Sequence, residues 1–588
     1  MVLSIKKNSA NWDKILMQFA FLVFTIIFAG TYCGPTLKMI EQLQLFQFTA
    51  HYFTRFAEAP GGILMYAGKF LTQFFYWPWL GAVIIAFLLL EIQVLLNKLF
   101  PLPKSLWALS FIPSLLLLIL QTGTGHLLGH SLGIFITLFL VLLYKGTGKN
   151  YRLISGSFLI VLSYFISGGH SLLVYVLFLM VDLNQKSSFR QIAFALSLRT
   201  ALLVIVLLAG YCRIYSEFSI HRVLLGSLPD ILIMPEAKQK WLFIFTYIFI
   251  GVIGFISLMN TEDLKKNQSS SYLFNGGLLL LLMILVARFS FSDKGLTVLL
   301  EIDQAVQEEK WDKVLDLARH YRNPERLVAY YTNVALCKSG RMADEMFAYD
   351  QSWGQNGLFI PFAKNPIVPI FGGEVYYQLG LVNYAYRWTY EGMVMHERSV
   401  RHLKRLYQIA LINQEDELAR KYRKTLSNGL FYDEWVKEMR RAPEIKQKRK
   451  LRPEKDFLIG SEFQFGALLR FAFSNNVYNK YLYNYMMAHF LLTKNLKLFV
   501  ENLENYPQYN QGKDLPSHYQ EALMIFAMQQ GDKAVKRVSK FNISEGMREK
   551  LKEFNRMYQS ARTSKAERRR LKQHFGDTYW YYYLLNRR

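Results

Sequence analysis

Three histidines and two glutamates are the side chains of this sequence that are best placed to do chemistry. His126 and His130 are four residues apart, so a helix would place both on one side, and His170 lies in a near copy of the sequence around His130. Glu41 and Glu58 lie in a separate polar stretch near the N-terminus. Imidazole and carboxylate groups are common general acids and bases, so this set predicts proton-transfer catalysis.

A metal site and a structural role are the alternatives for these histidines. The spacing of His126 and His130 lacks the glutamate of the zinc protease motif, and the three cysteines, Cys33, Cys212 and Cys337, have no metal-ligand spacing. No metal is therefore predicted, and the sequence leaves the cofactor unknown. A single histidine at a helix start more often makes only a local hydrogen bond. Convergence of several ionisable groups at one membrane face favours a functional role over a structural one, because ionisable groups near lipid cost free energy.

The elements that must position these residues are apolar runs in the first half of the chain. A helix needs roughly 20 mainly apolar residues to cross a bilayer, because its backbone amides find no partner in lipid. Nine segments within residues 1–291 meet or approach this length, and residues 292–588 contain none. The segments are Ile15–Tyr32, Trp77–Leu96, Leu106–Gln121, Leu127–Tyr144, Leu153–Gly168, Ser171–Leu183, Ile192–Gly210, Trp241–Met259 and Tyr272–Phe291.

Three of these segments need comment. The first is too long for a removable signal peptide and lacks a small-residue cleavage site, so it is predicted to be a retained helix. The fifth and sixth are short and are joined only through Gly168, Gly169 and His170, so they can also be one broken hairpin.

The positions of Lys and Arg residues in the short loops predict the orientation. Lys6, Lys7 and Lys14 precede the first segment, and alternate loops after it are also basic, whereas residues 122–126 and 168–170 contain neither Lys nor Arg. The N-terminus is therefore expected in the cytoplasm of a bacterium, with the protein in the inner membrane. Nine crossings would place residues 292–588 in the periplasm, and a different parity would place them in the cytoplasm.

The first outer loop, residues 33–76, is far longer than the four to six residues of a typical connection. The sequence Pro60-Gly61-Gly62 divides it into a pair of helices expected in the membrane interface. Because this loop carries Glu41 and Glu58, both carboxylates are expected at the face that His126, His130 and His170 reach.

One further pair of ionisable groups is predicted inside the membrane. Glu91 and Arg199 each lie about 10 Å from the cytoplasmic surface by helical rise. They are predicted to form a structural ion pair between the second and seventh segments.

Residues 292–588 are predicted to be a soluble, entirely α-helical domain. Trp311, Val314, Leu315 and Ala318 follow the three- and four-residue spacing of an amphipathic helix. Short polar turns separate helices of this kind, which resembles tetratricopeptide repeats, although no regular 34-residue period is present. The expected fold is all-α: a transmembrane bundle of about nine helices followed by a degenerate helical-hairpin solenoid, whose surface would suit a protein partner.

The C-terminal tail combines a basic helix with an aromatic cluster. Residues 568–570 are all arginine, and residues 579–583 are all aromatic. Aromatic side chains beside cations suit a lipid headgroup interface. Docking onto the solenoid as its last cap is the favoured alternative.

The net charge of +25 restricts the choice of partners. The excess is spread over the chain, with 21 basic and 10 acidic residues in positions 1–291. Anionic lipid headgroups or acidic glycans explain such a surface as well as nucleic acid does. No nucleic-acid recognition motif is present, so no nucleic-acid partner is predicted.

The layout of the first 290 residues resembles the GT-C class of membrane glycosyltransferases, in which a long outer loop with an acidic residue follows the first helix. The resemblance implies a polyprenyl-phosphate-linked sugar as donor, a glycan acceptor, and Glu41 or Glu58 as the general base, with Glu41 favoured. It further implies that basic residues near the outer face hold the lipid phosphate, namely Arg55, Lys69, Arg213 or Arg222. The class usually shows an aspartate or an acidic pair, and neither glutamate has an acidic neighbour.

Two other functions remain open. The chain as a whole resembles uncharacterised bacterial polytopic proteins with repeat-like C-terminal domains, which is compatible with a non-enzymatic envelope scaffold. The outer loop Tyr211–Lys240, with Arg213, His221 and Arg222, favours a polysaccharide polymerase or ligase. In that case Arg222, rather than Glu41, would be indispensable.

Overall fold

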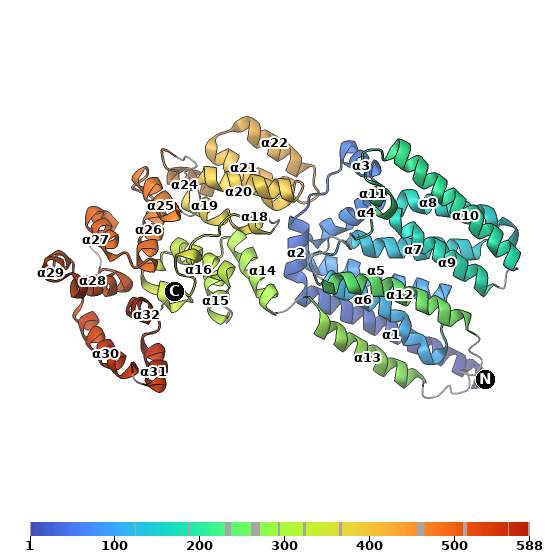
Figure 1. Cartoon of the computed structure of the whole chain (residues 1–588), viewed down its shortest axis with the longest axis horizontal. Coiled ribbons are helices and arrows are strands. Elements are labelled where there is room, and N and C mark those ends of the chain that lie inside the picture. Colours follow the sequence, from blue (N-terminus) through green and yellow to red (C-terminus); the bar gives the residue numbers. More distant parts are fainter. Residues whose placement is uncertain are drawn as a thin grey trace. The chain divides into compact units, whose positions relative to one another are not determined.

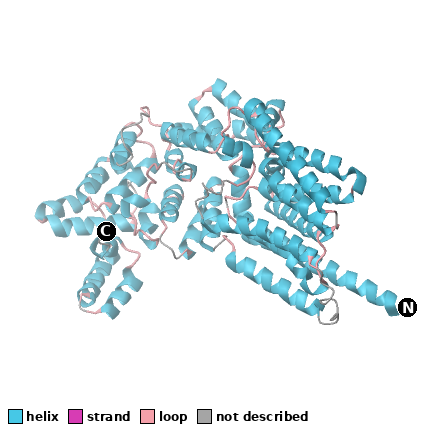
Figure 2. Ribbon diagram, turned by 45° about the vertical axis from the view of Figure 1, so that its right-hand side comes forward, coloured by secondary structure: helices cyan, strands magenta, loops and turns pink. Residues whose placement is uncertain are grey.

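The protein is entirely helical in the part of the chain that the computed structural model describes (Figure 2). The chain divides into two compact units: unit 1 comprises Met1–Asp293 with Ser427–Phe431, and unit 2 comprises Lys294–Leu426 with Tyr432–Arg588. The described residues are 2–123, 125–185, 188–229, 237–259, 271–291, 294–321, 325–363, 367–455, 464–509, 514–562 and 564–585.

Unit 1 consists of long apolar helices joined by short helical turns (Figure 1). Its elements are α1 (Val2–Tyr32), α2 (Gly34–Gln42), α3 (Ala50–Ala57), α4 (Gly62–Thr72), η1 (Gln73–Tyr76), α5 (Pro78–Leu99), η2 (Lys104–Phe111), α6 (Ile112–Gln121), α7 (Leu128–Gly146), η3 (Lys149–Tyr151), α8 (Arg152–Ser167), η4 (Gly168–His170), α9 (Ser171–Asn184), α10 (Phe189–Ala209), η5 (Gly210–Ile214), α11 (Ile220–Leu225), α12 (Ala237–Leu258) and α13 (Ser271–Phe289).

Seven stretches of the described helices are long and apolar enough to cross a membrane. The predicted fifth and sixth segments fall together in one of them, the stretch Arg152–Asn184, and the ninth coincides with the shorter apolar helix Leu273–Phe289. Unit 1 is therefore compatible with a multi-pass membrane protein.

The stretch Arg152–Asn184 is not a straight helix, because it turns back at Gly168. This glycine has a φ of 54°, in the left-handed region that favours glycine. The start of α8 and the end of α9 lie at the same end of the unit, since Arg199 contacts both the carbonyl oxygen of Arg152 (3.4 Å) and the carboxylate of Asp182 (3.0 Å). The two helices thus form a hairpin with η4 at its tip.

The outer loop predicted at residues 33–76 contains α2, α3, α4 and η1. Pro60 and Gly61 separate α3 from α4, as the sequence predicts, and Gly61 has a φ of 66°. The side chain of Thr49 caps α3 by accepting a hydrogen bond from the backbone amide of Tyr52 at 3.2 Å. Helix α4 then packs on α7 and α8, the helices that carry His130 and lead to His170.

Unit 2 is a succession of shorter helices, most of which pack on the next helix in the chain (Figure 1). Its elements are α14 (Lys294–Gln307), α15 (Trp311–His320), α16 (Arg326–Lys338), α17 (Met342–Glu345), η7 (Met346–Ala348), η8 (Gly354–Gly357), α18 (Val368–Phe371), α19 (Glu374–Leu379), α20 (Val382–Met395), α21 (Val400–Asn413), α22 (Asp416–Ser427), α23 (Asp433–Arg441), α24 (Pro443–Leu451), α25 (Phe465–Ser474), α26 (Lys480–Leu492), α27 (Leu496–Asn505), η10 (Pro507–Tyr509), α28 (Ser517–Gln530), α29 (Asp532–Val538), α30 (Glu545–Ala561), α31 (Lys565–Phe575) and α32 (Tyr579–Leu585).

Buried ion pairs join the helices of unit 2. Arg401 on α21 forms two hydrogen bonds to the carboxylate of Asp303 on α14, at 2.5 and 2.7 Å. Lys448 on α24 lies 3.2 Å from the carboxylate of Glu309 and is itself buried. Breaking such a pair leaves an uncompensated buried charge, so these contacts strongly favour one packing arrangement of the helices.

The aromatic C-terminal tail docks on its own unit. Tyr579 and Trp580 on α32 are almost fully buried. The backbone amide of Tyr579 donates to the carboxylate of Glu521 on α28 at 2.6 Å. The indole N–H of Trp580 donates to the backbone carbonyl oxygen of Glu521 at 3.1 Å. The structure therefore shows the tail docked on unit 2, whereas its role as the last cap of a solenoid stays a prediction.

Candidate functional site

The three histidines converge inside unit 1, at the end of the bundle where η4 lies. His126, His130 and His170 are all buried, and the rings of His126 and His130 are 5.5 Å apart. Gly133 brings α7 close to the third histidine, because a Cβ atom on this glycine would lie 2.4 Å from Nε2 of His170.

Each histidine has its own hydrogen-bond partner. Nε2 of His126 lies 3.0 Å from the hydroxyl of Ser131. Nδ1 of His130 donates to the backbone carbonyl oxygen of Ser227 at 2.8 Å, and Nδ1 of His170 lies 2.7 Å from the hydroxyl of Tyr247. These bonds fix the rings in place and tie α7 and η4 to α12 and to the loop after α11.

Burial restricts what these histidines can do chemically. Burial lowers the pKa of His126 well below its usual value, and neighbouring His130 lowers it further. Within the described residues, no group of three His, Cys, Asp or Glu residues is arranged to hold a metal ion. The histidines therefore have the surroundings of neutral hydrogen-bonding groups that connect helices.

The two glutamates lie in different surroundings. Glu41 is buried in α2, a helix that packs on η1 and α5. Glu58 is exposed and forms the C-terminal cap of α3. The two carboxylates therefore differ in accessibility, and their convergence with the imidazoles stays a prediction.

The predicted phosphate-binding cations lie in different environments. Arg55 on α3 and Arg213 on η5 are both exposed. Lys69 on α4 is half-buried, with its ammonium nitrogen 5.7 Å from the ring centre of Phe56. Arg222 on α11 is exposed and lines a cavity.

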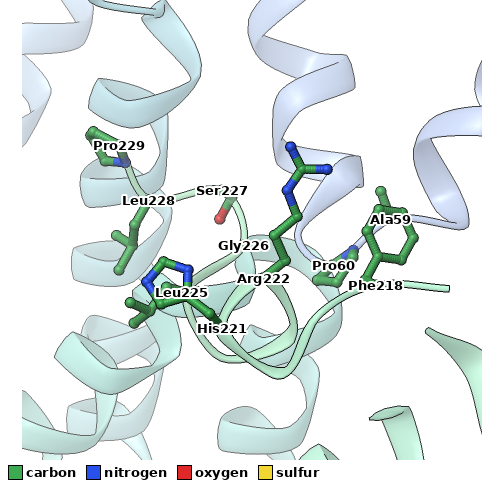
Figure 3. A pocket seen from close by; sticks show the side chains of 10 residues that line it. All are labelled: Ala59, Pro60, Phe218, His221, Arg222, Leu225, Gly226, Ser227, Leu228 and Pro229. Atoms are coloured by element: carbon green, nitrogen blue, oxygen red, sulfur yellow. The ribbon is translucent and has the colours of Figure 1, made fainter. Parts of the chain in front are cut away.

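That cavity, of about 580 Å³, is the most notable feature near the predicted site residues (Figure 3). One wall comes from the α3–α4 turn, and the other comes from α11 and the loops on either side of it. The lining residues are Ala59, Pro60, Phe218, His221, Arg222, Leu225, Gly226, Ser227, Leu228 and Pro229. Residues 230–236 of the predicted loop Tyr211–Lys240 lie outside the described part of the chain.

The cavity combines an apolar surface with two groups that can bind an anion. The side chains of His221 and Arg222 follow one another on α11, and both are exposed. No described residue forms an ion pair or side-chain hydrogen bond with the guanidinium group of Arg222. This group therefore keeps its five N–H donors available for a ligand. Glu58 directly precedes the lining residue Ala59.

Three backbone segments hold the cavity wall by close contacts. The amide of Gly169 donates to the carbonyl oxygen of Gly226 at 2.8 Å, and the hydroxyl of Ser227 donates to the carbonyl oxygen of Ser167 at 2.5 Å. A Cβ atom on Gly61 would lie 2.6 Å from the side chain of Ser227. Small residues are needed here because three turns meet at one point.

The predicted ion pair between Glu91 and Arg199 is wrong. Arg199 pairs with Asp182 at 3.0 Å and donates to the hydroxyl of Tyr144 at 2.7 Å, whereas Glu91 is exposed. Helical rise gives depth along the membrane but not the direction in which a side chain points. Asp182 is the only acidic residue of its apolar segment, and this signal in the sequence could have identified it.

The structure and cavity define a class: an all-helical protein whose first unit has the apolar helices of a multi-pass membrane protein and an amphiphilic cavity near one end of its bundle. A family model, a family of unknown function (DUF6057), matches residues 9–586. The chain therefore belongs to this family. No curated protein and no solved structure matches the chain.

Proposed function

We propose that this protein is a membrane enzyme that transfers a sugar from a polyprenyl-phosphate-linked donor to a glycan acceptor, as a polymerase or ligase does. The observation that carries the proposal is the cavity that Arg222 and His221 line together with mainly apolar residues. A lipid-linked sugar also combines a charged part with an apolar part, since its phosphate is charged and its lipid is apolar. A guanidinium group suits a phosphate because it can donate two parallel hydrogen bonds.

Residues in the cavity and next to it would divide the reaction between them. A carboxylate, for which exposed Glu58 is the candidate, takes the proton of the acceptor hydroxyl. The hydroxyl oxygen then bonds to the anomeric carbon of the donor sugar while the bond from that carbon to the phosphate oxygen breaks. Arg222 stabilises the negative charge that the departing polyprenyl phosphate gains. Glu58 replaces Glu41 in this proposal because Glu41 is buried in α2.

The buried histidines serve the cavity indirectly in this proposal. His130 donates to Ser227, which is part of the cavity wall. Its task is to position the wall, and no proton transfer is assigned to it.

Arginine substitutions test the proposal. Arg222→Gln should weaken binding of a radiolabelled polyprenyl phosphate by about tenfold or more in reconstituted protein, because a charge-assisted hydrogen bond contributes about 1.5–3 kcal/mol. Arg213→Gln is the matched control, since Arg213 is exposed on η5 and does not line the cavity. It should bind as the unchanged protein does.

The same variants distinguish the enzyme from the alternative scaffold. The enzyme proposal is supported if Arg222→Gln loses both lipid binding and sugar transfer. Glu58→Gln should then lose sugar transfer but keep lipid binding. Unchanged binding in Arg222→Gln refutes the assignment of this cavity. A protein that neither binds nor transfers a lipid-linked sugar would leave the envelope scaffold as the better proposal.

The cellular setting belongs to the same proposal. The basic residues of alternate loops favour an inner-membrane protein with a cytoplasmic N-terminus and a periplasmic unit 2. In the same proposal unit 2, whose successive helices mostly pack on one another, is a tetratricopeptide-like solenoid that binds a protein or glycan partner on its surface.

A further inference from the structure

A second cavity of unit 1 lies among three apolar helices and has a different character. Its volume is about 350 Å³, and α6, α12 and α13 line it. Helices α12 and α13 each pack on α6. The cavity is therefore a groove with α6 as its floor and the other two helices as its sides.

The groove is apolar except at one end. Leu115, Ile119 and Val286 are buried in it, whereas Trp241 and Phe289 remain more than half exposed. The lining residues are Ile112, Leu115, Leu116, Ile119, Lys238, Trp241, Leu242, Phe245, Leu282, Leu285, Val286 and Phe289. Exposed side chains of this kind are compatible with a groove that opens toward lipid, because α6 and α12 belong to candidate membrane spans and α13 is a shorter apolar helix.

Lys238 is the single charged residue of the lining, and other contacts hold it at the end of the groove. Its ammonium nitrogen lies 4.1 Å from the ring centre of Phe291 and donates to the carbonyl oxygen of Ser290 at 3.3 Å. An ammonium group has three donors, so this one retains donors for an anion. Lys238 is also exposed.

We propose that this groove binds one acyl chain of an anionic phospholipid, with the lipid phosphate at Lys238. Charge complementarity argues for this occupant, since the groove offers a hydrocarbon surface over its length and one cation at its end. A membrane supplies acyl chains in excess, so even weak binding would keep the groove occupied. This site is independent of the sugar-transfer proposal, because none of its lining residues lines the Arg222 cavity.

Photo-crosslinking in nanodiscs tests the site. The full chain is reconstituted in phosphatidylcholine with a minor fraction of phosphatidylglycerol that carries a diazirine within one acyl chain, and labelled peptides are mapped by mass spectrometry. Labelling should concentrate on α6, α12 and α13. The same diazirine on phosphatidylcholine should label these helices more weakly.

Two pairs of variants make the test specific. Leu285→Trp fills the groove and should abolish most of its labelling, whereas Leu281→Trp, on an exposed position of α13 outside the lining, should not. Lys238→Gln should reduce the preference for phosphatidylglycerol by about fivefold, the effect of one basic side chain near an anionic membrane. Lys240→Gln, on the same helix but outside the lining, should leave the preference unchanged.

Each contrary result overturns a stated part of the proposal. Labelling spread evenly over all apolar helices, or unchanged in Leu285→Trp, overturns the acyl-chain site. Equal labelling by the two lipids, or equal effects of Lys238→Gln and Lys240→Gln, overturns the anionic headgroup. If Leu285→Trp lowers the melting temperature of the protein, Leu282→Phe repeats the filling test with a smaller side chain.

Discussion

His130 on α7 donates a hydrogen bond from Nδ1 to the backbone carbonyl oxygen of Ser227, at 2.8 Å. A carbonyl oxygen can only accept, so this contact requires the proton on Nδ1. Ser227 lines the Arg222 cavity, and the loop that carries it has a left-handed conformation at this residue, with a φ of 69°. A histidine in the bundle thus holds a strained turn in the wall of the cavity.

Removal of this histidine should loosen the wall. In His130→Ala the part-buried carbonyl oxygen of Ser227 loses this donor, which should cost about 0.5–1.5 kcal/mol of folding free energy. Hydrogen exchange in residues 220–229 should accelerate, as measured by mass spectrometry. His51→Ala is the control, because His51 is exposed on α3. Equal exchange in the two variants would show that His130 does not support this loop.

Gly168 should not tolerate a side chain. A Cβ atom there would lie 2.4 Å from the carbonyl oxygen of Gly226, and the φ of Gly168 is 54°. Gly168→Ala should therefore lower the melting temperature in detergent and disturb the Arg222 cavity. Gly251→Ala on α12 is the control, since its Cβ atom meets nothing within 4 Å, and it should be neutral or stabilise by up to about 1 kcal/mol. A melting temperature for Gly168→Ala that matches this control would contradict the close packing of the turns.

The pairing of Arg199 can be tested directly. Asp182→Ala should cost about 3–5 kcal/mol, because it leaves the buried guanidinium group of Arg199 without its carboxylate. Glu91→Ala should change the free energy of unfolding by less than about 0.5 kcal/mol, as is usual for exposed positions. The measurement is unfolding in detergent. The reverse order of effects would restore the pair predicted from the sequence.

Unit 2 should lose stability in acid partly through His402. Burial, together with the neighbouring side chains of Arg401 and His396, lowers the pKa of His402 to about 3. In the unfolded chain His402 takes up a proton with a pKa of 6.5. The stability that depends on neutral His402 is therefore fully present above pH 6.5 and declines as the pH falls toward about 3. The slope is at most about 1.4 kcal/mol per pH unit.

Substitution of His402 should therefore flatten the pH dependence. His402→Asn should reduce the loss of local stability of α21 between about pH 7 and pH 5, measured by hydrogen exchange after correction for its intrinsic pH dependence. His320→Asn is the control, because His320 is exposed at the end of α15. An identical slope in both variants would assign the acid sensitivity to other groups.

The orientation proposal predicts the side of unit 2. A phosphatase reporter that folds only in the periplasm should be active when fused after residue 588, and a fluorescent reporter that folds only in the cytoplasm should be dark there. A fusion after Gly146, which ends α7, should give the opposite result, because Lys145 lies in a loop predicted to be cytoplasmic. Activity of both phosphatase fusions would show that the orientation is wrong.

The sequence by itself determined the helical composition and the long apolar stretches. Hydrophobic run length is a local property, because a helix satisfies its backbone hydrogen bonds within its own segment. The break at Pro60 and Gly61 was predictable for the same reason, since proline and glycine act on the backbone where they stand. The meeting of His126, His130 and His170 was also predicted, because three segments were expected to end at one face.

Only the tertiary structure decided the directions and partners of the polar side chains. It paired Arg199 with Asp182 instead of Glu91, and it buried the histidines while leaving Glu58 exposed. These outcomes depend on the rotation of each helix about its axis, which is fixed by packing against helices distant in the sequence. The Arg222 cavity arises in the same way, because its two walls come from residues 59–60 and 218–229.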